Sequence, residues 1–145
     1  MKVALGSDHA GFAMKGALGA ILESWGHEVD DLGAYSEESV DYPDFAAKVG
    51  RGVAAGDYEA GILICGTGLG MTIAANKIKG VRAVVAHDTF SARMSRAHNN
   101  ANVLALGARV IGQGLAEEIV KVWLSTEFEG GRHQRRLDKI DQLEG

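Results

Sequence analysis

The chain has 145 residues, the size of one domain, and is long enough to bury about two-thirds of the surface that its unfolded form would expose. A composition of 46% hydrophobic and 23% charged residues is typical of globular proteins and excludes collagen-like and low-complexity chains. No apolar run approaches the roughly 18 to 20 residues of a membrane span, and a net charge of −4 disfavours broad nucleic-acid binding. The unusual feature is 20 glycines beside one proline and one cysteine.

The N-terminal segment and the single cysteine predict a cytoplasmic protein. Residues 1–11 carry one Lys and reach Ser7, Asp8 and His9 after only a few apolar residues, which does not fit a signal peptide. Cys65 has no second cysteine with which to form an internal disulfide, so any role it has lies in packing or in thiol chemistry.

Short apolar runs alternate along the chain with segments of helical periodicity. The predicted strands, in chain order, are 3–6, 27–33, 60–65, 81–86 and 102–107. The predicted helices between and after them are 12–25, 43–55, 69–78, 89–98 and 114–124. Repeated strand–helix units imply right-handed crossovers and a parallel sheet with helices on both faces.

The predicted architecture is therefore a single α/β domain over residues 1–145, a three-layer αβα Rossmann-like fold with five parallel strands. We expect the strand order 2-1-3-4-5, with 60–65 and 81–86 buried on both faces and the more polar 27–33 at an edge. The tail repeats Leu137, Ile140 and Leu143 at three-residue spacing, which predicts an amphipathic helix at about 132–144 that docks on this subunit or on another.

Two loops at the carboxyl ends of the first and third strands are the candidate site. Open parallel sheets bind ligands beyond these ends, at the point where the strand order reverses. In the order 2-1-3-4-5 the first and third strands are neighbours, so the loops 6–11 and 65–70 face each other. One crevice would then hold Asp8, His9, Cys65 and Thr67.

The second of these loops, Cys65-Gly66-Thr67-Gly68-Leu69-Gly70, favours an anion or oxyanion site. Three glycines in five residues leave backbone N–H groups uncovered at the start of a helix, although tight strand–helix packing is the alternative reading. It is not a dinucleotide fingerprint, because Met71 stands where G-x-G-x-x-G needs Gly, and neither glycine loop ends in the Gly-Lys-Ser/Thr of a P-loop.

Cys65 and His98 each allow two interpretations from the residues alone. Cys65 lies just before a glycine-rich helix N-terminus, where a thiolate base or nucleophile is favoured, but a buried inert cysteine fits equally well. His98 ends the helix after the fourth strand, about 15 Å from the crevice at ~1.5 Å per residue. A catalytic His98 would therefore serve a neighbouring subunit, whereas geometry alone favours a helix-capping histidine.

The basic cluster at 131–136 is a candidate phosphate clamp. Arg132 and Arg136 are four residues apart, on one helix face, and solvated charge is the alternative. No aromatic residues interleave with the cluster, which disfavours nucleic acid. No His or Cys pair has metal-ligand spacing, so we expect no metal site.

Five long motifs span the whole chain: GSDHAGF at 6–12, DYPDFA at 41–46, CGTGLGMTIAANK at 65–77, AHNNANVLALGAR at 97–109 and GGRHQRR at 130–136. Together they resemble the ribose-5-phosphate isomerase B family of sugar-phosphate isomerases. The family includes isomerases of allose 6-phosphate and galactose 6-phosphate. The resemblance implies a Rossmann-like fold, no metal or organic cofactor, and a homodimer with active sites shared between subunits.

The resemblance also implies a role for each matching residue. Cys65 would be the base that moves a proton between C1 and C2 through a cis-enediolate, and the backbone from Gly66 through Thr67, Gly68 and Leu69 to Gly70 would stabilise that anion. His98 from the partner subunit, assisted by Asp8 and Thr67, would open the sugar ring. The residues implied for phosphate and hydroxyl binding are His9, Arg109, Arg132 and Arg136 for the phosphate and Asn99 for the hydroxyls.

The sequence thus predicts a cofactor-free aldose–ketose isomerase that interconverts ribose 5-phosphate and ribulose 5-phosphate. Isomerisation of a six-carbon sugar phosphate is one alternative, and a non-enzymatic phosphate-binding module is another. The sequence leaves open the choice between dimer and tetramer.

Overall fold

The five strands form one parallel sheet, in a computed structural model that describes residues 1–144. The strands are β1 (Lys2–Ser7), β2 (Glu28–Asp31), β3 (Ala60–Cys65), β4 (Ala83–Val85) and β5 (Val103–Gly107). The helices are α1 (Phe12–Ser24), α2 (Tyr42–Ala54), α3 (Leu69–Ala75), α4 (Thr89–Ala97), α5 (Gln113–Ser125) and α6 (Arg132–Gln142). The predicted αβα, Rossmann-like class and all five strand segments are confirmed.

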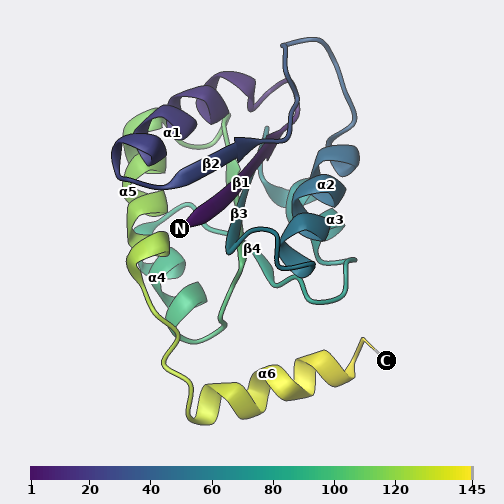
Figure 1. Ribbon diagram of the computed structural model, residues 1–145, viewed down its shortest axis with the longest axis vertical. Helices are drawn as coiled ribbons and strands as arrows, with labels where there is room; N and C mark the ends of the chain where they lie inside the picture. The colour runs from purple at the N-terminus through teal and green to yellow at the C-terminus, as the bar shows by residue number, and fades with distance from the viewer. Residues whose placement is uncertain (145) are drawn as a thin grey trace.

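The two faces of the sheet bury separate apolar clusters, because successive side chains of a strand point to opposite faces. Leu5, Ile62 and Leu104 pack towards α1, α4 and α5, whereas Leu63 and Ala105 pack towards α2 and α3. Figure 1 shows α1 and α5 on one side of the sheet and α2 and α3 on the other. No described helix is long and apolar enough to cross a bilayer.

The strand order is β2-β1-β3-β5-β4, which corrects the expected 2-1-3-4-5 order at one edge. β5 lies beside β3 and is buried along its whole length, while β4 has only three residues and two of them are partly exposed. The side-chain amide of Asn76 donates to the Ala83 carbonyl and accepts from the Ala83 N–H, each at 2.8 Å. The Asn76 amide thus forms hydrogen bonds with the Ala83 backbone that a further strand beside β4 would otherwise form. The expected full burial of 81–86 is therefore wrong, and the edge position of β2 is confirmed.

The C-terminal helix α6 ends at Gln142, two residues before the predicted end. Only its His133 and Leu137 are buried, and Ile140 and Leu143 are 50% and 86% exposed. α6 lies apart from the other helices in Figure 1, across one end of the molecule. Part of the predicted apolar stripe is thus uncovered in the single chain.

Candidate active site

β1 and β3 are adjacent, so the loops that follow them lie together as expected. Ser7 and Ile64 are paired in register, and the Asp8 N–H donates to the Ile64 carbonyl at 3.2 Å. The Asp8 carboxylate is buried and accepts from the Gly11 N–H at 3.1 Å. A carboxylate fixed in this way keeps its second oxygen available for a ligand or a proton.

Cys65 is the last residue of β3 and is 4% exposed. The Gly68 N–H donates to its Sγ at 3.1 Å, inside the loop that joins β3 to α3. An N–H donor directed at sulfur stabilises negative charge there, as a thiolate base requires. The contact favours the chemical reading of Cys65 over inert packing.

The glycines of this loop are required by its backbone path. Gly68 has φ of +80°, which disfavours any side chain, and a β-carbon there would lie 2.9 Å from Val85 Cγ2. Within residues 1–144, the N–H groups of Gly66 and Thr67 donate to no protein acceptor. Such unpartnered donors beside a thiol can stabilise an oxyanion as it forms.

Arg109 brings a positive charge to the same loop. Its N–H donates to the Gly66 carbonyl at 3.0 Å, and a β-carbon at Gly66 would lie 3.3 Å from the Arg109 guanidinium. Arg109 follows β5 and reaches the Cys65 loop because β5 lies directly beside β3. The expected strand order had placed this last strand at the edge of the sheet instead. The structure therefore joins Asp8, His9, Cys65, the 66–70 loop with Thr67 and Leu69, and Arg109 at one end of the sheet.

Tyr42 is a further member of this site, and the sequence reasoning assigned it no role. It is the first residue of α2 and is 39% exposed, and its hydroxyl would lie 2.8 Å from a β-carbon at Gly70. Only the glycine at 70 lets the phenol approach the loop. In the sequence, Tyr42 precedes the single proline at the start of a helix, within the motif DYPDFA at 41–46.

The remaining predicted residues gather at the opposite end of the sheet. α4 begins after the carboxyl end of β4 and runs back for nine residues, which places His98 about 14 Å away at ~1.5 Å per residue. The imidazoles of His98 and His133 stack at 4.1 Å between centroids, which brings the start of α6 with Arg132 and Arg136 to this end. Asn99 lines a cavity of about 420 Å³ together with Leu137 and Ile140 of α6.

Glu129 and His133 accompany His98; the sequence assigned no role to Glu129 and placed His133 only within the basic cluster 131–136. Glu129 Oε1 lies 3.7 Å from His98 Nε2 and 3.5 Å from His133 Nε2. Burial lowers the pKa of His133, and the neighbouring His98 and Arg132 act in the same direction. The lowered pKa favours the neutral form of His133, the ring that stacks on His98.

These three side chains are also the one group of potential metal donors among the described residues, all within 4.8 Å of one another. The two imidazole planes differ by only 14° and are stacked. A ring nitrogen binds a metal roughly in the plane of its ring, so stacked parallel rings do not direct two nitrogens to one ion. The arrangement suits a positioned acid–base histidine better than a metal centre.

Comparison with known proteins gives one consistent family. The family model described as Ribose/Galactose Isomerase matches residues 3–140. Ribose-5-phosphate isomerase B of Escherichia coli is 51% identical over 143 residues, covering 99% of this chain and 96% of that protein. A D-erythrulose-4-phosphate isomerase of Pectobacterium atrosepticum is 44% identical over 146 residues, covering 99% and 95%.

A solved structure shows the same fold with a ligand. Ribose-5-phosphate isomerase B from Mycoplasma genitalium, with bound ribulose-5-phosphate, matches at a TM-score of 0.94 and 43% identity, covering 99% of this chain and 95% of that one. The chain therefore belongs to the ribose/galactose isomerase family.

Proposed function

We propose that the chain is an aldose–ketose isomerase that interconverts D-ribose 5-phosphate and D-ribulose 5-phosphate. Relatives named for this activity match over nearly the whole chain, and one of them holds the ketose product. The observation that supports the chemistry best is the buried Cys65 thiol, whose sulfur accepts a hydrogen bond from the Gly68 N–H. The N–H groups of Gly66 and Thr67, which donate to no acceptor within residues 1–144, lie beside it. A base and an oxyanion site side by side are what enediolate chemistry needs.

The proton transfer is proposed as follows. The Cys65 thiolate removes the proton from C2 of the open-chain aldose, and the released electron pair forms the C1=C2 bond as negative charge moves to O1. The N–H groups of the 66–70 loop stabilise that charge. Return of the proton to C1, with the O2 proton passing to O1, gives the ketose. This step uses only groups of the chain and the substrate.

Ring opening and phosphate binding are assigned to the other predicted residues. We propose that His98, with Asp8 and Thr67, transfers protons between the ring oxygen and the anomeric hydroxyl. His9, Arg109, Arg132 and Arg136 would bind the phosphate, and Asn99 the sugar hydroxyls. The positions of Asp8 and Arg109 beside Cys65 support their part in this assignment.

We further propose a homodimer in which each site takes residues from both subunits. His98, Arg132 and Arg136 lie at the opposite end of the sheet from Cys65, so one chain does not assemble the full set. The exposed Ile140 and Leu143 of the α6 segment supply apolar surface for a second copy. A cytoplasmic location is proposed because the single free thiol is kept reduced there.

The experiment is an isomerisation assay on ribose 5-phosphate, erythrulose 4-phosphate and allose 6-phosphate. We expect the highest kcat/KM on ribose 5-phosphate. A higher value on the four-carbon substrate would reassign the chain towards the activity named for the Pectobacterium relative. Deuterium uptake from heavy water at C1 or C2 separates an enzyme from a binding module, since binding alone exchanges no carbon-bound proton.

A further inference from the structure

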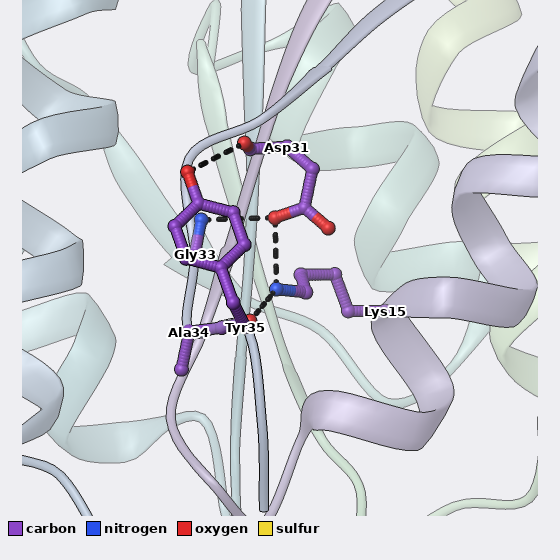
Figure 2. A network of polar contacts seen from close by, with 5 residues as sticks. All are labelled: Lys15, Asp31, Gly33, Ala34 and Tyr35. Carbon is purple, nitrogen blue, oxygen red and sulfur yellow. Dashed lines mark hydrogen bonds and ion pairs between the residues drawn. The ribbon is translucent and has the colours of Figure 1, made fainter.

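Lys15 of α1 is a charged side chain that the proposed chemistry does not use, yet it is only 1% exposed. Its ammonium group donates to Asp31 Oδ1 at 2.8 Å and to the Ala34 carbonyl, and the rings of Phe12 and Tyr35 lie within 5.7 Å of Nζ. Figure 2 shows the ammonium between Asp31 and Ala34. A buried ammonium is costly unless it is paired in this way, so Lys15 firmly couples α1 to the segment after β2.

That segment, residues 32–41, is the loop between β2 and α2, and its first residues are fixed on two sides. Asp31 Oδ1 also accepts from the Gly33 N–H at 2.9 Å, and the Tyr35 hydroxyl donates to the Asp31 carbonyl at 3.1 Å. On the β1 side, the Ser7 N–H donates to the Gly33 carbonyl at 2.7 Å and the Ala34 N–H donates to the Ser7 carbonyl at 2.8 Å. The start of the loop is thereby attached to β1 directly before Asp8.

The far end of the loop contacts His9. The Val40 N–H donates to His9 Nδ1 at 3.3 Å, while the intervening residues 36–39 are exposed. An imidazole nitrogen that accepts a hydrogen bond carries no proton, so the neutral ring holds its proton on Nε2. Nε2 is then the only nitrogen of His9 that can donate to a phosphate oxygen.

We propose that the loop 32–41, anchored by the buried Lys15–Asp31 pair, positions His9 through the Val40 N–H so that Nε2–H is its substrate-side donor. Lys15, Asp31 and Val40 are then positioning residues for phosphate binding. This inference rests on the proposed function, because it takes the phosphate role of His9 from there. It adds the device that fixes the tautomer and orientation of the ring.

The first test replaces the donor with Val40→Pro, which removes the N–H, and compares it with Glu37→Pro as a matched control. Glu37 lies in the same loop, and its N–H has no protein acceptor among the described residues. In ¹⁵N NMR of the neutral ring, we expect His9 of the unmodified protein to be the Nε2–H tautomer with Nδ1 as acceptor. Val40→Pro should give averaged nitrogen shifts, and Glu37→Pro should not.

The kinetic constants should also distinguish Val40→Pro from Glu37→Pro. Losing one hydrogen bond that orients a ligand donor predicts a KM for ribose 5-phosphate raised about threefold to tenfold in Val40→Pro, with kcat changed less than about twofold. Unchanged His9 shifts, or an unchanged KM, in Val40→Pro would overturn the proposal. Failure of the unmodified protein to isomerise any sugar phosphate would overturn the proposed function instead, since the NMR result needs no turnover.

The second test addresses the anchor itself. Lys15→Met keeps an apolar stem and removes the charge, and Lys48→Met is the control, since Lys48 is an exposed lysine of α2 that also lies over an aromatic ring, that of Phe45. We expect Lys15→Met to raise KM and average the His9 shifts as Val40→Pro does. A folded Lys15→Met protein with unmodified His9 shifts and KM would contradict the role of the anchor.

Discussion

At the residue scale, the account depends most on Cys65. Cys65→Ala removes the proposed base while leaving the loop backbone and Arg109 in place. We expect kcat to fall by about 10³-fold or more, because an alanine side chain cannot accept the proton from C2. Competitive inhibition by a non-isomerisable sugar phosphate should stay within about twofold of the unmodified protein. Turnover at the original rate would show that Cys65 is not the base.

His133 supplies a pH-dependent prediction at the same scale. Burial lowers its pKa in the folded state, so between that value and the ordinary histidine value the unfolded chain binds more protons than the folded one. Stability from this source is present at higher pH and is lost as the pH falls through that window. We expect Tm to drop as the pH falls below the ordinary histidine pKa of about 6.5, and to drop less in His133→Gln. Parallel curves for the two proteins would contradict this account.

Individual residues differ in how far the sequence revealed their place. The glycines and Cys65 follow an identifiable strand, so the topology rule alone brought them next to Asp8. Tyr42 and His133 follow no strand, so this rule did not place them; each lies where it does through a packing contact between segments far apart in the chain. The hydrogen bond from the Val40 N–H to His9 could not be predicted from the sequence either, because every residue except proline has a backbone N–H.

At the scale of elements, periodicity located the helices and strands, but it did not order the last two strands. Segments 81–86 and 102–107 are both apolar, and the choice between centre and edge depends on cross-chain contacts such as the Asn76 amide on Ala83. The order matters for function, because only a central β5 delivers Arg109 to the Cys65 loop.

A matched pair of substitutions tests that order. Val103 in β5 is fully buried, whereas Val84 in β4 is partly exposed. Val103→Ala should lower the free energy of unfolding by about 2 to 3 kcal/mol, from lost burial and the remaining cavity, and Val84→Ala by less than about 1 kcal/mol. Urea denaturation of the two variants measures the difference. Equal losses would argue against a central β5 and an edge β4.

At the scale of the whole molecule, the chain divides its proposed machinery between two ends of one sheet. Cys65, the proposed base, lies with Asp8 and Arg109 at the carboxyl end, and His98 lies with α6 at the amino end. The uncovered apolar residues of α6 lie near the second group. In a two-fold symmetric dimer, the carboxyl end of each chain's sheet would meet the amino end of its partner's sheet. Each dimer would then carry two equivalent sites.

Subunit complementation tests this central claim most directly. Cys65→Ala and His98→Asn chains are each expected to be nearly inactive, but a mixed dimer has one site with both functional residues. After exchange verified by native mass spectrometry, an equimolar mixture should recover about a quarter of the unmodified activity, since half of the dimers are mixed and each has one competent site. No recovery in verified mixed dimers would contradict a site shared between subunits.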